Sequence, residues 1–427
     1  MTKTMKFSRV VMAALILALA SAGVATAEEN GDLAERVRRL EEQLAERDQA
    51  DKNESKPSSE SVGHDIFGTG TSIGAYGEFI YNNVLGGRTA KDTWDARRMV
   101  LFVGHEFSDE WRFFSEIEVE HGEEIFLEQA FIDWQPRQEI GLQAGVLLLP
   151  LGIINVTHEP TTFYFSERPR VDNALIPSTF RENGVMAYGS FGDLSYQLGV
   201  FNAGEIEGIA PTAAPPSAGD LDGIATGGIR FSRQKAVEAF SNDFAVAGRL
   251  QYAAPGGLTL GLGGYTGEFD HNIKSPAISA IVDHRARITI GEVDLRFVME
   301  QLEVRGEYAI VWLGGASALN SAPGLTASVP DRLHGGYVEI AYDILPHIVE
   351  SDQRLFVAFR GEWLDLQAST PTGIAKIGGA EEQQEYNFGI AWKPVDGVIA
   401  KADYQIRRDD TAAGVPDQFN ASVGLSF

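Results

Sequence analysis

From residue 71 to the end of the chain, apolar and polar side chains alternate with a period of two. Successive side chains of a β-strand point to opposite faces of a sheet, so this period is typical of strands. The last ten residues show it best, because small polar residues there separate five apolar ones. The apolar face carries Phe419, Ala421, Val423, Leu425 and Phe427. The pattern predicts strands that each have one apolar and one polar face.

Breaks in the alternation divide this region into sixteen segments, each long enough to cross a bilayer at a tilt, which takes about 9–11 residues. Short turns alternate with longer loops. A strand-like segment at 226–233 is assigned to a loop, because a seventeenth strand would break that alternation. None of the 17 prolines lies inside a proposed strand, as expected for a residue that cannot donate to a ladder. The expected strands are 71–83, 95–107, 111–121, 125–135, 138–149, 183–191, 194–203, 243–254, 257–269, 286–299, 301–313, 334–345, 353–367, 384–393, 397–408 and 418–427.

These strands predict an all-β fold, a sixteen-stranded antiparallel transmembrane β-barrel. After the N-terminal region no stretch reaches the roughly 20 apolar residues of a membrane helix, so a membrane-embedded chain must form a closed barrel. A barrel of this strand number leaves a water-filled channel, whereas a barrel of about eight strands is filled by its own side chains. The alternative for the final strand is a soluble amphipathic strand.

The N-terminal region predicts three further segments. Residues 1–27 have a basic start, an apolar run too short for an anchor and a small-residue cleavage site, which together indicate a secretory signal peptide. Residues 28–50 carry leucine and valine at heptad spacing, which predicts a periplasmic coiled-coil helix or, alternatively, a lone solvated helix. Residues 51–67 have the composition of a flexible linker. The barrel then occupies residues 68–427.

Composition narrows the classes of function. The 427 residues have a formal net charge of -25 and include no Cys. The acidity argues against nucleic acid as a partner, because nucleic-acid binders need a basic face. A chain without Cys has no disulfides, no Cys-ligated metal and no thiol catalysis.

Charged residues on the polar faces of the strands should line the channel. They carry both signs, and opposite charges on neighbouring strands can pair. Two interpretations stay open: the charges hydrate the wall, or they select the solutes that pass. The face of 125–135 is also open, because both of its faces carry apolar groups and Glu128 could point either way. The candidate pore-lining residues are Arg112, Glu116, Glu118, Arg249, Glu292, Asp294, Arg296, Glu303, Arg305, Glu307, Arg354, Arg360, Lys401 and Arg407.

The third long loop, residues 150–182, is the candidate constriction. A loop of about 30 residues without regular structure is usually functional. His158 and Glu159 could begin a metal site, but two ligands without a third are weak support, so no metal and no other cofactor is expected. No G-x-S-x-G string is present, so catalysis is not expected either. The candidate residues of this loop are His158, Glu159, Arg168, Arg170, Asp172 and Arg181.

Several strings between residues 90 and 192 resemble the phosphate-selective porins O and P of the bacterial outer membrane. In chain order they are Arg97-Arg98, Gly104-His105-Glu106-Phe107-Ser108-Asp109-Glu110-Trp111, Gln129-Ala130-Phe131-Ile132-Asp133-Trp134, Gly145-Val146-Leu147-Leu148-Leu149-Pro150-Leu151-Gly152, Glu167-Arg168-Pro169 and Phe180-Arg181-Glu182-Asn183-Gly184-Val185. The resemblance implies a homotrimeric channel that is constricted by its third loop and passes anions such as phosphate. The terminal Phe427 likewise resembles the signal that the barrel-assembly machinery reads.

The expected protein is an outer-membrane porin, surrounded by lipid and lipopolysaccharide, for passive diffusion of small hydrophilic solutes or inorganic ions. The loop 150–182 has three Arg against four acidic residues, and the strands carry more acids than bases. An acidic pore favours cations, so the residues predict a weak cation preference where the resemblance implies anions. The alternatives are a structural barrel attached to the periplasm by its coiled coil, and a barrel hydrolase.

Overall fold

The computed structural model describes residues 64–65, 70–85, 91–205, 227–269, 286–321, 328–410 and 415–427. The chain divides into two units, Met1–Ser59 and Glu60–Phe427, and all the described residues belong to the second. The predicted signal peptide and coiled coil lie outside the described residues. In the predicted linker, His64–Asp65 forms a short strand, β1, which pairs with residues 72 and 73.

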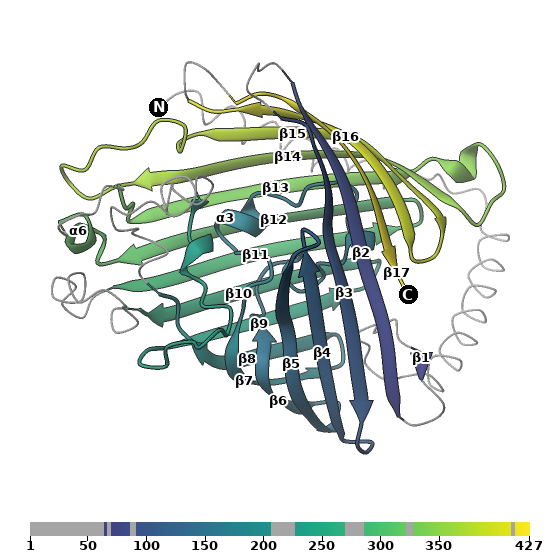
Figure 1. Ribbon diagram of the computed structural model, residues 1–427, viewed down its shortest axis with the longest axis horizontal. Helices are drawn as coiled ribbons and strands as arrows, with labels where there is room; N and C mark the ends of the chain where they lie inside the picture. The colour runs from purple at the N-terminus through teal and green to yellow at the C-terminus, as the bar shows by residue number, and fades with distance from the viewer. Residues whose placement is uncertain are drawn as a thin grey trace, which may run out of the picture. The chain divides into compact units, whose positions relative to one another are not determined.

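Sixteen strands, β2 to β17, form one antiparallel sheet (Figure 1). All sixteen predicted strands are confirmed, and each observed end lies within two residues of the predicted one. Residues 227–233 of the segment assigned to a loop are indeed not part of a strand. The strands are β2 (Thr71–Val84), β3 (Thr93–Glu106), β4 (Trp111–Glu120), β5 (Glu124–Arg137), β6 (Ile140–Leu148), β7 (Arg181–Phe191), β8 (Leu194–Asn202), β9 (Phe244–Ala254), β10 (Leu258–Glu268), β11 (Arg287–Met299), β12 (Leu302–Gly314), β13 (Arg332–Asp343), β14 (Arg354–Ser369), β15 (Gln383–Val395), β16 (Val398–Arg408) and β17 (Gln418–Ser426).

The sheet closes on itself. Each strand pairs with the next, and β17 pairs with β2 from Gln418 opposite Val84 to Ser426 opposite Tyr76. The terminal Phe427 continues this seam, since its backbone N–H donates to Ala75 O at 2.9 Å and its oxygen accepts from Ala75 N at 2.8 Å. Closure leaves no strand edge with unpaired backbone groups, which a bilayer requires.

Two prolines correct the expectation that strands exclude proline. Pro136 lies near the end of β5 and Pro394 near the end of β15. The pairing register shifts at both places, between Trp134 and Arg137 and between Trp392 and Val395. A strand tolerates proline at such irregularities because no ladder hydrogen bond is lost there.

The alternation places apolar side chains outside and charged ones inside. In β12, Tyr308 and Trp312 are exposed on the outer face, whereas Arg305 and Glu307 face inward and are buried. In β5, Leu127 points outward and Glu128 is fully buried inside, which settles the face that the sequence left open. An exposed apolar band around a barrel is the surface that lipid covers.

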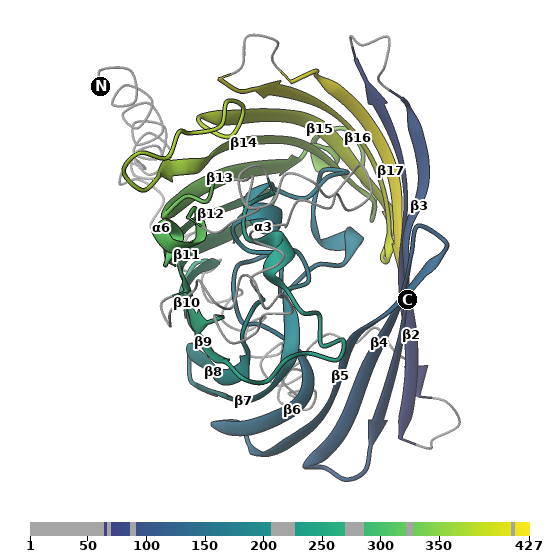
Figure 2. The ribbon, with the colours of Figure 1, turned by 60° about the vertical axis from the view of Figure 1, so that its left-hand side comes forward.

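The loop from residue 149 to 180 folds inside the barrel (Figure 2). Arg181, which the sequence predicts to lie in this loop, is instead the first residue of β7. It contains a short 3₁₀ turn, η1 (Pro160–Thr162), and one helical turn, α3 (Val171–Ala174), which contacts β12 and β13. Its apolar residues, including Leu151, Ile176 and Phe180, form a buried cluster with inward-facing residues of β9 to β14. The remaining helical turns are η2 (Arg230–Ser232), α6 (Ala316–Leu319) and η3 (Leu345–His347). None of the helices in the described ranges is long and apolar enough to cross a bilayer.

Candidate functional site

Cations of the barrel wall hold the loop 150–182 by its backbone carbonyls. Three inward-facing side chains each donate a hydrogen bond to one loop carbonyl. The contacts run from Arg305 to Thr162 O (3.2 Å), from Arg360 to Glu167 O (3.0 Å) and from Lys401 to Phe165 O (3.2 Å). Arg360 also lies over the ring of Phe165, 4.8 Å from its centroid. These predicted pore residues therefore fasten the loop to the wall.

Carboxylates of the wall hold the same loop by its backbone N–H groups. Four wall acids each accept one hydrogen bond from the loop. The contacts run from Gly152 N to Glu292 (3.2 Å), from Ile153 N to Glu307 (2.9 Å), from Ser166 N to Asp403 (2.8 Å) and from Arg170 N to Glu362 (2.6 Å). Hydrogen bonds to charged groups are stronger than neutral ones, so the wall charges stabilise one position of the loop.

The wall charges also pair with one another. Arg249 contacts Glu292 at 2.6 Å and Asp294 at 2.7 Å. Two glycines of β10 make room for this pair, because a Cβ at Gly261 or Gly263 would lie within 2.2 Å of the paired side chains. In this part of the wall the charges of Arg249 and the two carboxylates offset each other.

The other predicted wall residues lie near the barrel ends or on β4. Arg112 pairs with Asp133 at 2.8 Å, and Arg354 pairs with Asp343 at 3.1 Å and Glu303 at 3.7 Å. Arg407 donates to Pro416 O and to Gln418. Arg296 is exposed on β11, opposite Arg305 of β12. These residues do not line the cavity described next.

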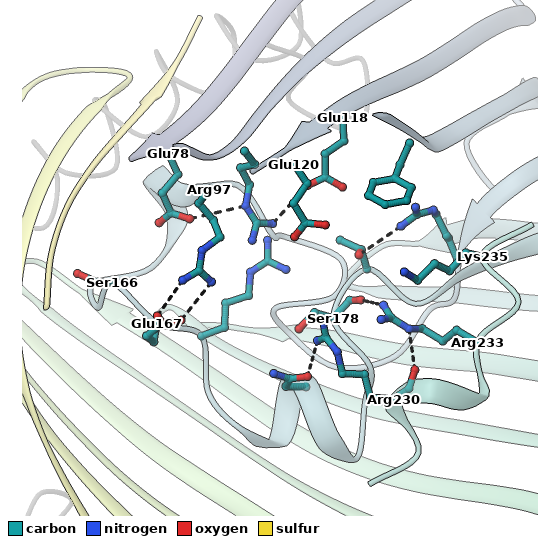
Figure 3. Close-up of a pocket in the computed structure, with 16 residues that line it drawn as sticks. Glu78, Arg97, Glu118, Glu120, Ser166, Glu167, Ser178, Arg230, Arg233 and Lys235 are labelled. Carbon is teal, nitrogen blue, oxygen red and sulfur yellow. Dashed lines mark hydrogen bonds and ion pairs between the residues drawn. The ribbon is translucent and has the colours of Figure 1, made fainter. Parts of the chain in front are cut away.

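A cavity lies between the wall strands β2 to β5, the loop 150–182 and the segment 227–243 (Figure 3). We call it the arginine-rich cavity. Seven of its sixteen lining residues are Arg or Lys and four are Glu. The lining consists of Glu78, Arg97, Arg98, Glu118, Glu120, Phe126, Ser166, Glu167, Arg168, Asn173, Ser178, Thr179, Arg181, Arg230, Arg233 and Lys235.

Two of the cavity arginines pair with carboxylates. Arg97 pairs with Glu167 at 3.0 Å. Arg98 lies between Glu78 at 3.7 Å and Glu118 at 3.8 Å. Three of the four cavity carboxylates are thus matched by two arginines.

Three further cations of the cavity bind neutral groups. Arg168 donates to His158 O at 2.8 Å, Arg233 donates to Arg230 O at 3.0 Å, and Arg181 donates to Thr179 Oγ1 at 3.4 Å. Within the described ranges none of these three arginines has a carboxylate within ion-pair distance. With seven cations against four carboxylates, the cavity lining therefore has excess positive charge.

The pKa values of two loop arginines reflect this excess. Burial and the neighbouring guanidinium of Arg98 lower the pKa of Arg168 to about 10. Burial and the guanidinium groups of Arg230 and Arg181 lower the pKa of Arg233 to about 9. Like charges disfavour the protonated form, so an anion in the cavity would relieve their repulsion.

The remaining loop residues lie away from the arginine-rich cavity. His158 faces Glu116 and Glu128 on the inner wall. Burial would lower the pKa of His158, but these carboxylates raise it to about 9. Glu159 precedes η1, and its carbonyl accepts from Thr162. Asp172 is fully buried, and burial raises the pKa of its carboxyl well above the usual range.

No family model matches the chain. An uncharacterized protein of Aquifex aeolicus (strain VF5) is 32% identical over 369 residues, which make up 84% of this chain and 80% of that protein. The chain belongs to the same family as that protein.

The chain shares a barrel fold with solved outer-membrane proteins. Salmonella typhi OmpF matches with a TM-score of 0.55 at 11% identity, over 85% of this chain and 100% of its own. The outer membrane channel DcaP of Acinetobacter baumannii matches with a TM-score of 0.51 at 13% identity, over 86% and 100%. The trimer form of Vibrio cholerae OmpT matches with a TM-score of 0.50 at 9% identity, over 84% and 99%. At these identities the likeness shows the fold, a porin-type barrel. The narrower resemblance to phosphate-selective porins stays a prediction.

Sequence reasoning found part of this site. Of the candidates, Glu118, Arg168 and Arg181 line the arginine-rich cavity. It missed the contribution of the segment 227–243, although Arg230, Arg233 and Lys235 form a local basic run. A basic run of this kind inside an acidic chain is a sequence signal that could have identified the segment as part of the site. Arg97-Arg98 entered only as a motif of the resemblance.

Proposed function

We propose that this chain is an outer-membrane channel for passive diffusion of small hydrophilic solutes, and that it prefers anions. The observation that carries the preference is the arginine-rich cavity, which Arg168, Arg181 and Arg233 line without a carboxylate at ion-pair distance among the described residues. Charged groups lining a pore set the local concentration of permeating ions.

The proposal opposes the weak cation preference that the acid excess predicts. Most wall acids are paired with Arg or occupied by backbone N–H groups of the loop. Screening limits each remaining charge to a range of about 8 Å at physiological ionic strength. Ions in the cavity therefore respond to its own lining more than to the net charge of -25. Phosphate is a candidate solute, since bidentate recognition of phosphate is a typical use of Arg.

The test is the zero-current potential of the purified protein in planar bilayers across a salt gradient. We expect discrete conductance steps, a potential with the sign of chloride preference, and block of the chloride current by phosphate. A potential of the opposite sign would restore the cation preference predicted from composition. A protein that inserts but gives no conductance steps would favour the structural barrel instead. Lipid hydrolysis by the same preparation would favour the barrel hydrolase.

We also propose that residues 28–50 act in the periplasm by joining three copies of the chain. Two heptads alone are too short for a stable coiled coil, so the barrels must bring the helices together. Deleting residues 29–50 should shift the protein from trimer toward monomer in cross-linking and light scattering, while membrane insertion is unchanged. Loss of insertion would contradict this role for the segment.

Phe427 is the proposed contact with the barrel-assembly machinery. Its backbone completes the seam with Ala75, and its side chain is exposed. An exposed aromatic at a barrel's edge is available to a folding partner and later to the lipid interface.

A further inference from the structure

Three side chains from three separate elements, one of them the histidine of the loop 150–182, lie close together inside the barrel. Glu116 comes from β4, Glu128 from β5 and His158 from the loop. His158 Nε2 lies 3.8 Å from Glu116 Oε2 and 3.7 Å from Glu128 Oε2, and one ligand atom of each residue lies within 4.8 Å of the others. Their exposed fractions are 3%, 0% and 2%, so water does not solvate them.

The histidine presents a nitrogen to both carboxylates. Its Nδ1 lies 3.3 Å from Asn155 O, so a ring that gives up its Nε2 proton to a metal keeps the other proton on Nδ1. Nε2 then faces the two carboxylates as a ligand atom. His158 Nε2, Glu116 Oε2 and Glu128 Oε1 are buried atoms without a hydrogen-bond partner among the described residues. Buried groups of this polarity are strongly destabilising unless a positive charge lies among them.

We propose that a divalent transition-metal ion, for which Zn²⁺ is the probe, binds between Glu116, Glu128 and His158. Imidazole nitrogen and carboxylate oxygen are both zinc ligands, and ligand atoms roughly 2.0–2.2 Å from a central ion lie about 3.5 Å apart. The observed 3.7 and 3.8 Å need only a small closure. A proton on Nε2 fits these distances less well, because a charge-assisted hydrogen bond needs about 2.8 Å.

Neighbouring groups position the ligands as in known metal sites. The pairing of β4 with β5 shifts register after Glu116. Glu116 pairs with Gln129 and the next residue of β4 pairs with Leu127, so Glu128 has no partner on β4. Such a bulge re-aims a side chain, here toward the lumen. Tyr76 donates its hydroxyl to Glu128 Oε2 at 3.2 Å, and the carbonyl of Asn155 holds the other nitrogen of the ring. Outer contacts of this kind orient metal ligands.

A metal here would tie the loop to the wall strands β4 and β5. The carbonyl of His158 accepts from Arg168, which lines the arginine-rich cavity. Occupancy of the site should therefore fix the position of a cavity cation. This consequence for conductance rests on the proposed channel function, whereas the metal site itself does not.

The binding test uses tag-free full-length protein in detergent, stripped with EDTA and titrated with Zn²⁺ by calorimetry and elemental analysis. We expect one Zn²⁺ per protomer and roughly 100-fold weaker binding in His158→Gln and in Glu128→Gln, since even outer contacts are worth about 10–100-fold. The matched control is His121→Gln, an exposed histidine that also lies beside acids, at 2.7 Å from Asp95. It should leave the affinity unchanged.

Heat-modifiable migration on gels verifies that each variant is folded. If wild type, His158→Gln and Glu128→Gln bound Zn²⁺ with equal affinity, the proposed site would be wrong. It would also be wrong if His121→Gln alone abolished Zn²⁺ binding. In bilayers, Zn²⁺ should change the conductance of wild type and EDTA should reverse the change, with no response from His158→Gln. If Zn²⁺ binds as expected but the protein never conducts, the site stands and the proposed channel function fails.

Discussion

Replacing Arg168 and Arg233 together by Gln is expected to abolish the anion preference of the channel. The two guanidinium groups line the arginine-rich cavity, and within the described ranges neither has a carboxylate at ion-pair distance. A unit charge a few ångströms away in water is worth about 1 kcal/mol, which is roughly a fivefold change in local ion concentration. Removing two charges should reverse or cancel the zero-current potential, measured in bilayers across a potassium chloride gradient.

The matched control for this double variant is Arg137→Gln, which removes an exposed arginine at the turn between β5 and β6. It should leave the ratio of chloride to potassium permeability unchanged. The amide of Gln can still donate to the carbonyls that Arg168 and Arg233 contact, so the loops keep part of their support. A double variant with the wild-type ratio would place the path of the ions away from this cavity.

The strands could be predicted from the sequence because their signal is local. Alternation along each strand reports which face meets lipid, and the order of short and long connections fixes the number of strands. The strand-like segment 226–233 shows the value of the second rule, since only the alternation of connections assigned it to a loop. In the structure its described residues, 227–233, lie outside the strands. Closure then follows, because an open edge would leave unpaired backbone groups in the bilayer.

The constriction could be located in the sequence, but its contacts could not. The wall cations hold the loop through the backbone carbonyls of Thr162, Phe165 and Glu167. Every residue has a backbone carbonyl, so the sequence does not indicate which ones are bound. Glu128 faces inward because a bulge interrupts the period of two, and a bulge shifts the faces without changing the composition. The two carboxylates proposed to bind metal beside His158 could therefore not be predicted from His158-Glu159 alone.

Net charge was the weakest guide to the candidate site. The wall acids counted toward an acidic pore, yet Glu292, Glu307 and Glu362 accept hydrogen bonds from the loop backbone. The cavity cations instead come partly from a segment, 227–243, that the sequence places far from the loop 150–182. Which charges face the ions depends on how both segments fold inside the barrel. The net charge of the chain does not contain that information.

Arg360→Met is expected to be the most destabilising single substitution in the barrel wall. The guanidinium of Arg360 is fully buried and contacts Glu362 at 2.7 Å, Glu339 at 3.5 Å and Glu385 at 3.9 Å. Removing one partner of a buried ion pair leaves an uncompensated charge and lowers the free energy of unfolding by about 3–5 kcal/mol. The measurement is urea-induced unfolding of the protein folded into lipid vesicles, followed by tryptophan fluorescence.

Two comparisons separate this mechanism from a general sensitivity of the wall. Arg287→Met removes an arginine that is half exposed and pairs with Glu268, so it should lower the free energy of unfolding by only about 0–1 kcal/mol. Arg360→Lys retains a positive charge among the three carboxylates and should fall between the two. Because Arg360 also donates to Glu167 O, Arg360→Met should release the loop and increase the noise of the open channel. An Arg360→Met barrel as stable as wild type, with a quiet channel, would mean that the carboxylates around Arg360 are held by other groups.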